Sequence, residues 1–228
     1  MAQDYNPSII SRNLVWAIDA GNTKSYPGSG TAWNDLTRRG TNGTLIGGPS
    51  YNLGTLAFNG STQYADFNYN HNNESDWYAS SFTLGGFAKQ TATKTNDSWL
   101  FDLDYVGYRL WGSNNVPFMV RGPSASWSIS TAYPFVVNQW HYVVATMIDN
   151  GSANNVKVYI DGELFSTHTF GTKNIGYAVG ANYYVRLAAH HHNGLGRPFE
   201  LGYLHKNNTI LTADEVKQNY QALKGKFV

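Results

Sequence analysis

The run from Trp140 to Ile148 restricts the fold of this chain more than any other segment. A strand with one solvent-facing side alternates apolar and polar residues, but here both alternating sets are apolar. The run therefore predicts a strand that is covered on both faces. The two sets are Trp140, Tyr142, Val144 and Ile148, and then Val143, Ala145 and Met147.

Two more strands are expected directly after this run. Beyond a polar loop at residues 149–155, residues 156–161 alternate between an apolar and a wetter set, as in a half-buried antiparallel strand. Asp161 and Gly162 suit a two-residue type I′ turn, because both central positions of that turn need a positive φ. The chain then returns from Leu164 to Phe170. Residues 140–170 thus predict a three-stranded antiparallel meander.

Composition favours an all-β domain. Aromatic residues make up 15% of the chain, charged residues only 14%, and there are 23 glycines, a balance typical of a turn-rich β fold. The 228 residues suffice for one β-sandwich with a substantial core. No repeat or linker is visible, so we expect a single domain at residues 14–228. It follows an extended arm at residues 1–13, which is polar apart from Ile9 and Ile10.

The remaining elements are expected from periodicity and turn residues. Residues 19–48 are dominated by turn-forming residues and should form a long irregular stretch. One helix is expected near the C-terminus: Thr212 is its N-cap, Glu215 completes a capping box, Leu211 and Val216 form a hydrophobic staple, and Gly225 ends it. A helix of about ten residues is marginal alone in water, so it must dock on the sandwich. Further strands are expected at residues 14–18, 55–58, 64–67, 82–88, 99–103, 108–111, 118–121, 177–180, 183–189 and 199–205.

Several classes of function are disfavoured. A net charge of +1 without a basic block offers little phosphate neutralisation, so we expect no nucleic-acid partner. The absence of cysteine excludes disulfides and thiolate metal sites. No apolar run approaches about 18 residues, and the first residues lack a signal peptide, so we expect synthesis in a cytoplasm and no membrane partner. The glycines lie in turns and not before helices, so no cofactor is expected.

Two stretches carry a resemblance to a known superfamily. Residues 140–146, Trp-His-Tyr-Val-Val-Ala-Thr, and residues 156–162, Val-Lys-Val-Tyr-Ile-Asp-Gly, resemble laminin-G-like domains of the concanavalin A-like jelly-roll superfamily. This resemblance implies a jelly-roll sandwich of two antiparallel sheets.

The two ends of the chain narrow the resemblance. An apolar strand ends in Asp-Ala-Gly-Asn at residues 19–22, then come Ser-Tyr-Pro-Gly-Ser-Gly at 25–30 and Trp-Asn-Asp-Leu at 33–36. This opening is similar to that of a group of tailed-bacteriophage virion proteins with a laminin-G-like jelly roll. The similarity extends to Asn-Gly-Thr-Leu at 42–45, to Gly-Pro at 48–49 and to the closing segments at 211–220 and 225–227. The resemblance covers nearly the whole chain. It implies a domain displayed on, or built into, a phage particle.

Two candidate metal sites are weak. Relatives often carry Asp-Gly-x-Asp-Asp-Tyr after the second strand, where this chain has Asn59-Gly60-Ser61-Thr62-Gln63-Tyr64. Carboxylates that Ca²⁺ prefers are thus replaced by amides or hydroxyls. In the run at residues 190–192, His-His-His, the outer two would face the same way on a strand and form a bidentate pair at best. We expect no metal at either place, and a loop or interface role for the histidines.

Hydrolysis is the alternative that the superfamily raises, because it includes glucanases marked by a Glu-x-Asp-x-x-Glu-like strand. The most similar segment of this chain is Phe101-Asp102-Leu103-Asp104-Tyr105, which lacks both glutamates. A retaining mechanism needs two carboxyl groups about 5 Å apart, which alternate strand residues can supply. We nevertheless expect no catalytic residues. Asp102 and Asp104 are interpreted as solvated or hydrogen-bonded residues of a strand face.

Aromatic residues in loop-like segments are the remaining candidates for a binding surface. Sugar sites use flat aromatic faces with amides, and protein interfaces are enriched in the same aromatics, so the sequence does not separate these two uses from core packing. The candidates are Trp77, Tyr105, Trp111, Tyr183, Tyr184 and His191.

The preferred hypothesis is a non-enzymatic bacteriophage virion protein that decorates the capsid or forms an appendage such as a fibre, neck or tail. We expect other virion proteins as partners, localisation in the virion, and a homo-oligomer. Extended termini often add strands or fill grooves on a partner, so the arm is the expected attachment element through Tyr5, Pro7, Ile9 and Ile10. The alternative is a lectin-like adhesin module that recognises host or environmental glycans.

Overall fold

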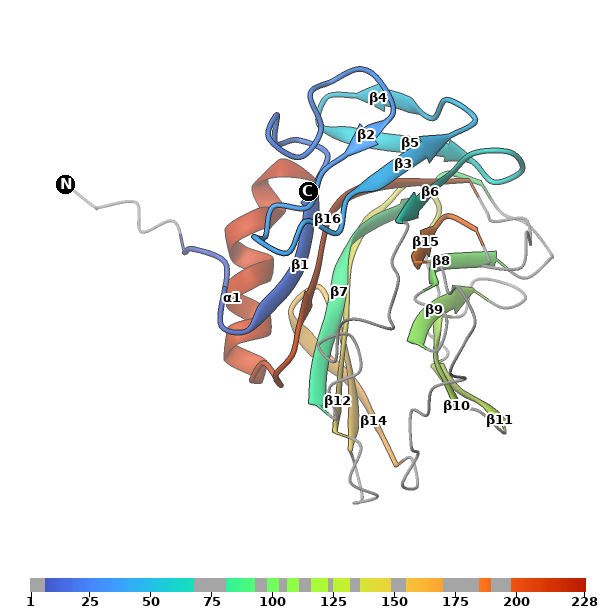
Figure 1. The fold of residues 1–228 in the computed structure, drawn as a ribbon. Coiled ribbons are helices and arrows are strands. Elements are labelled where there is room, and N and C mark those ends of the chain that lie inside the picture. The colour runs from blue at the N-terminus through green and yellow to red at the C-terminus, as the bar shows by residue number, and fades with distance from the viewer. Residues whose placement is uncertain are drawn as a thin grey trace.

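The protein is a three-layered sandwich in which a C-terminal helix covers one of two antiparallel sheets (Figure 1). A computed structural model describes residues 7–67, 81–92, 98–102, 106–110, 116–122, 125–131, 136–148, 155–169, 185–189 and 198–228, with the backbone alone between 98 and 131. The layers are the helix, the first sheet and the second sheet. This arrangement confirms the predicted all-β jelly roll with one short C-terminal helix.

The first sheet has the order β14-β13-β12-β7-β16-β5-β4, and β1 also pairs with β16. The second sheet has the order β11-β10-β9-β8-β15-β6-β3-β2. Every pairing in both sheets is antiparallel among the described residues. The first sheet comprises β1 (Leu14–Asp19), β4 (Ser50–Asn52), β5 (Thr55–Asn59), β7 (Ser81–Gln90), β12 (Trp140–Ile148), β13 (Val156–Ile160), β14 (Glu163–His168) and β16 (Pro198–Asn207). The second comprises β2 (Ala32–Trp33), β3 (Gly43–Ile46), β6 (Tyr64–Phe67), β8 (Ser98–Asp102), β9 (Val106–Leu110), β10 (Val116–Gly122), β11 (Ala125–Thr131) and β15 (Val185–Leu187).

The predicted meander is formed by β12, β13 and β14. Strand β12 is covered on both faces: Val143 belongs to the core between the two sheets, and Val144 belongs to a second core beneath the helix. Asp161 and Gly162 have φ values of 51° and 84°, which confirms the type I′ turn. The run that restricts the fold most is therefore the strand that separates the two apolar cores.

The glycines of β7 allow a close approach of neighbouring backbones. A Cβ atom on Gly85 would lie 2.4 Å from the carbonyl oxygen of Val143, and one on Gly86 would lie 2.4 Å from that of Tyr203. The register between β7 and β16 also shifts between Leu201 and Leu204. A larger residue at Gly85 would push β12 away from β7, and a larger residue at Gly86 would push β16 away from β7.

The helix α1 (Ala213–Leu223) follows the predicted signals. The Thr212 hydroxyl accepts a hydrogen bond from the Glu215 N–H at 3.2 Å, and the Glu215 carboxylate accepts one from the Thr212 N–H at 2.8 Å. Leu211 and Val216 are buried together in the second core. The α-helix ends two residues before the expected Gly225, because the last turn tightens into the 3₁₀ helix η3 (Lys224–Lys226). No helix among the described residues is long and apolar enough to cross a membrane.

The prediction of an irregular stretch at residues 19–48 is partly wrong, because these residues contain β2 and β3. Both strands are at most four residues long, too short for alternation to stand out against the surrounding glycines. Strand β4 follows at residues 50–52, and β11 was also not anticipated, although Trp127 and Ile129 alternate with serines there. The strand expected at residues 177–180 lies outside the described residues, and of the one expected at 183–189 the structure describes β15.

Candidate functional site

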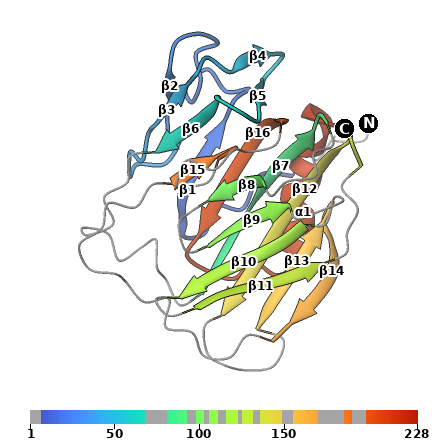
Figure 2. The ribbon, with the colours of Figure 1, turned by 90° about the vertical axis from the view of Figure 1, so that its right-hand side faces the viewer.

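The outer face of the second sheet carries a charged pair on strands β6 and β15. Ala65 and Phe67 of β6, like Val185 and Leu187 of β15, belong to the core between the sheets. Because successive side chains of a strand alternate between faces, Asp66 and Arg186 lie on the opposite, outer face. The two strands lie side by side in Figure 2, and their register places Asp66 directly opposite Arg186.

An ion pair and an aromatic ring hold the arginine in place. The Nε and Nη2 atoms of Arg186 donate hydrogen bonds to Oδ2 of Asp66 at 3.2 Å and 3.1 Å. The guanidinium carbon lies 5.1 Å from the centroid of the Tyr64 ring, within the range of a cation–π contact. We call these three residues the Arg186 cluster. Arg186 is only 8% exposed although it carries a charge.

Because Asp66 and Arg186 are largely buried, each charge depends on the other for its stabilisation. Removing one partner of a buried ion pair typically costs about 3–5 kcal/mol, because the other charge is left uncompensated. Oδ1 of Asp66 lies below the surface and accepts no hydrogen bond from any residue that the structure describes. The side chain as a whole is 19% exposed, although Oδ1 itself is covered. A shielded carboxylate oxygen without a donor is destabilising, and a ligand hydroxyl would relieve this.

Residues of the neighbouring strands lie in register with Asp66 and Arg186 on both sides of the pair. Thr44 of β3 lies opposite Asp66 and is exposed. Asp102 of β8 pairs with Arg186 by its backbone register, whereas Asp104 lies outside the described residues. Strand β15 thus separates the strands of Asp66 and Asp102, whose backbones are about 10 Å apart at the usual strand spacing.

Sequence reasoning missed the Arg186 cluster. A usable signal was present, because Asp66 and Arg186 are single charged residues between apolar ones in Ala65-Asp66-Phe67 and Val185-Arg186-Leu187. All six aromatic and histidine candidates lie outside the described residues, as does Tyr5 of the arm. These six are Trp77, Tyr105, Trp111, Tyr183, Tyr184 and His191.

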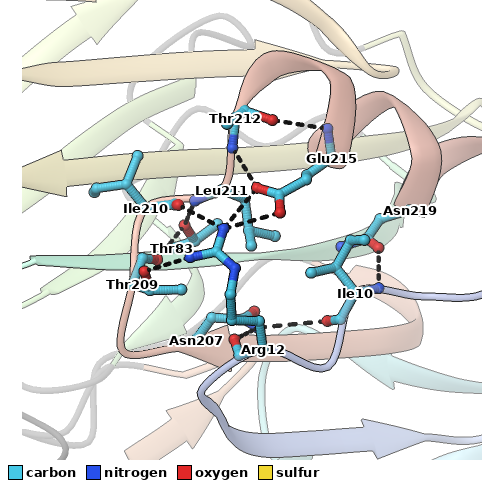
Figure 3. A network of polar contacts seen from close by, with 10 residues as sticks. All are labelled: Ile10, Arg12, Thr83, Asn207, Thr209, Ile210, Leu211, Thr212, Glu215 and Asn219. Atoms are coloured by element: carbon cyan, nitrogen blue, oxygen red, sulfur yellow. Dashed lines mark hydrogen bonds and ion pairs between the residues drawn. The ribbon is translucent and has the colours of Figure 1, made fainter.

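The described part of the arm, residues 7–13, lies against its own chain in a groove between α1 and β16. We call this the arm groove (Figure 3). The N–H of Ile10 donates to Oδ1 of Asn219 at 2.7 Å. Asn207 of β16 donates through Nδ2 to the carbonyl of Arg12 at 3.0 Å and, at 3.5 Å, to that of Ile10. Gln218 donates to the carbonyl of Ser8 at 2.8 Å. The groove therefore binds mainly the backbone of the arm.

Side chains complete this attachment. Nη2 of Arg12 donates to both carboxylate oxygens of Glu215, at 2.9 Å and 2.8 Å. Burial opposes ionisation of Glu215, but hydrogen bonds from Arg12 and Thr212 outweigh it and hold the pKa of Glu215 below its ordinary value. Of the predicted attachment residues, Ile9 and Ile10 pack against the second core and Pro7 is half-buried. The arm's expected role in binding a partner stays a prediction.

The corner at residues 59–63 is occupied by its own hydrogen bonds. Oδ1 of Asn59 accepts the backbone N–H groups of Ser61, Thr62 and Gln63 at 2.9–3.2 Å. The Gln63 amide donates to two backbone carbonyls of residues 47–48. Oδ1 of Asn59 and these two carbonyl oxygens are thus engaged within the corner and are less available to a Ca²⁺ ion. Within the described ranges, no group of three or more His, Asp or Glu side chains is arranged to hold a metal.

Comparison with protein-family models assigns this sandwich to a superfamily. Residues 59–217 match the model of the concanavalin A-like lectin/glucanases superfamily, in its laminin G form. The chain belongs to this superfamily. No curated protein matches the sequence.

Solved structures share the fold at low sequence identity. The sialidase of Trypanosoma rangeli, in complex with sialic acid, is 14% identical with a TM-score of 0.69 over 96% of this chain and 34% of that one. The receptor-binding domain of botulinum neurotoxin C/D mosaic serotype is 14% identical, with a TM-score of 0.69 over 92% of this chain and 51% of that one. The binding domain of botulinum neurotoxin DC, in complex with SialylT, is 11% identical, with a TM-score of 0.70 over 92% and 52%.

This likeness establishes the fold and leaves the chemistry open. The chain spans only a third to about a half of the length of these proteins. An enzyme and toxin binding domains share the architecture, so the fold alone does not decide between catalysis and binding.

Proposed function

We propose that this protein is a non-enzymatic, lectin-like module that binds glycans at the Arg186 cluster on the outer face of the second sheet. The observation that carries the proposal is a carboxylate that is 19% exposed and lacks a donor for Oδ1, held beside an arginine and a tyrosine ring in a sandwich of the lectin/glucanases superfamily. Small-ligand sites commonly combine a few fixed polar groups with apolar and aromatic surface.

The three side chains have separate tasks in this proposal. Oδ1 of Asp66 accepts a hydrogen bond from a sugar hydroxyl that displaces the groups covering this oxygen, and Arg186 keeps the carboxylate charged and fixed in direction. Tyr64 offers its ring surface to the sugar. Thr44, which is exposed, lies opposite Asp66 on the neighbouring strand β3. Complexes of the structural neighbours with sialic acid and SialylT support the choice of glycans as the ligand class.

A glycan array with the purified protein tests this proposal. Asp66→Asn keeps the shape of the side chain and removes its charge. We expect at least a tenfold loss of binding, since a hydrogen bond to a charged group contributes about 1.5–3 kcal/mol. Glu163→Gln is the matched control, because it neutralises an ion-paired carboxylate in the exposed pair with Lys217. Circular dichroism at the assay temperature verifies that both variants are folded. Unchanged binding by Asp66→Asn would refute the site.

We also propose that the module is displayed on a bacteriophage particle, as a capsid decoration or an appendage subunit. Its partners are then other virion proteins and further copies of this chain. The support is the likeness of both chain ends to tailed-phage virion proteins, together with their packing into one unit. Strand β1 pairs with β16, and Lys226 donates to the buried carboxylate of Asp19 at 2.8 Å.

Mass spectrometry of gradient-purified particles tests the virion role directly. We expect peptides of this chain at a fixed ratio to the major capsid protein. Deletion of residues 2–12 should reduce incorporation if the arm attaches the protein to the particle. Absence of the chain from purified particles would reject the virion role, while full incorporation of the deletion variant would reject the arm as the attachment element.

A further inference from the structure

The outer face of the second sheet carries two rows of side chains at the Arg186 cluster. Strands β3, β6 and β15 lie side by side in Figure 2, and their register places Thr44, Asp66 and Arg186 in one row. Ile46 and Tyr64 pair in the neighbouring row. Both rows face outward, because the residues that separate them along β3 and β6 belong to the core between the sheets. A polar row thus adjoins a row of one aliphatic and one aromatic side chain.

The spacing of the two rows suits a single sugar ring. Residues two positions apart on a strand are separated by twice its rise of about 3.4 Å, so the rows are about 7 Å apart. A pyranose has an apolar C–H face and a rim of hydroxyl groups. One ring can therefore lay its C–H face on Ile46 and Tyr64 while a hydroxyl of its rim reaches Asp66.

The charges in the polar row are already balanced. Nε and Nη2 of Arg186 donate to Oδ2 of Asp66 at 3.2 Å and 3.1 Å, and Arg186 is only 8% exposed. Asp66 and Arg186 are the only charged residues of β3, β6 and β15. An acidic ligand would therefore meet a neutralised pair, with no second cation on these three strands.

Two contacts keep Arg186 from leaving Asp66 for an acidic ligand. The ring of Tyr64 lies 5.1 Å from the guanidinium carbon and fixes the arginine from the side. Turning the guanidinium to a ligand would also leave the largely buried carboxylate of Asp66 without its counter-charge, which is strongly destabilising.

The atom of the cluster that lacks a partner is an acceptor. Oδ1 of Asp66 accepts no hydrogen bond from any residue that the structure describes. An ionised carboxylate has no proton to donate, so its complement is a donor such as a sugar hydroxyl. A ligand carboxylate is also only an acceptor, and beside Asp66 it would add like-charge repulsion. The open position of the cluster therefore favours a hydroxyl and disfavours an acid.

We propose that the Arg186 cluster selects a neutral pyranose and rejects sugars that carry a carboxylate, an inference that rests on the glycan-binding function proposed above. One ring hydroxyl displaces the groups that cover Oδ1 of Asp66 and donates to that oxygen. The C–H face of the ring packs on Ile46 and Tyr64. Thr44, which is exposed and lies opposite Asp66, can donate to or accept from a second hydroxyl.

Matched ligands that differ only at C6 test this selection in the wild-type protein. The probes are the methyl glycosides of glucose, galactose and mannose, each compared with the methyl glycoside of its uronic acid. Chemical-shift titration of the ¹⁵N-labelled protein measures even weak affinities. For each hexose that binds, we expect at least tenfold weaker binding of its uronic acid, because a carboxylate on the bound ring stays within one ring's width of Asp66.

The outcomes separate this inference from the function on which it rests. A uronic acid that binds as tightly as its hexose, or more tightly, would overturn the selection and leave glycan binding intact. Absence of binding by all six glycosides and by every glycan of the array would reject glycan binding, and the selection with it.

Two variants assign the selection to the carboxylate. In folded Asp66→Asn the repulsion is absent and Asp66 no longer neutralises Arg186, so the preference for the hexose should vanish or reverse. Ile46→Ala is the control, because it shortens the apolar row without changing a charge; it should weaken both members of a pair by the same factor. A tenfold preference that persists in Asp66→Asn would contradict the proposal. If Asp66→Asn does not fold, the wild-type comparison of the matched ligands still decides.

Discussion

The buried His205 should make the protein measurably less stable in mild acid. Burial lowers its pKa from 6.5 to about 4, so the folded protein resists a proton that the unfolded chain accepts. Stability then rises with pH wherever the unfolded state binds more protons. The contribution of His205 is fully present above about pH 6.5, falls as the pH drops below that value, and is exhausted near pH 4.

The magnitude follows from the two pKa values. At pH 5 the unfolded imidazole is almost fully protonated and the folded one almost fully neutral, whereas at pH 7 both are mostly neutral. With 1.36 kcal/mol for each unit of pKa difference, this one group should reduce the free energy of unfolding by about 2 kcal/mol between pH 7 and pH 5.

Urea unfolding followed by tryptophan fluorescence measures this effect at both pH values. The other six histidines and the carboxylates contribute equally in the wild type and in His205→Gln, so the difference between the two pH dependences isolates His205. We expect the wild type to lose about 2 kcal/mol more than the variant. Identical pH dependence in the two proteins would refute the reasoning, because it would mean that His205 titrates normally in the folded state.

Three further outcomes are expected. Gly85→Ala should cost about 1–3 kcal/mol in urea unfolding, because its methyl group would lie 2.4 Å from the Val143 carbonyl oxygen; a neutral result would show that β7 can shift freely. Thr212→Ala should cost about 1 kcal/mol by losing the helix cap, measured in the same assay, whereas an unchanged midpoint would mean that the cap contributes nothing. Addition of EDTA or Ca²⁺ should leave the melting temperature unchanged, because Asn59 and Gln63 bind their own turn; a shift of several degrees with Ca²⁺ would reveal a calcium site.

Local periodicity predicted the elements that bury large surfaces. Strand β12 and the Thr212 capping box were recognisable because their defining residues are at most a few positions apart. Strands β2 and β3 were missed because two to four residues surrounded by glycines give alternation too little length to be distinctive.

The functional contacts were beyond sequence reasoning because they join distant residues. Asp66 and Arg186 are 120 positions apart and meet only through the register of β6 with β15. Ile10 and Asn219 are 209 positions apart, so the sequence indicated an extended arm that is polar apart from Ile9 and Ile10, but not its attachment to its own helix. The aromatic candidates that sequence reasoning favoured stay predictions.

Glycan binding at the Arg186 cluster is tested most directly by titration calorimetry with the best ligand from the array. The account predicts a saturable heat for the wild type and for Glu163→Gln, and an affinity at least tenfold weaker for folded Asp66→Asn. Equal affinities of the wild type and Asp66→Asn, or the absence of binding to every glycan tested, would contradict it.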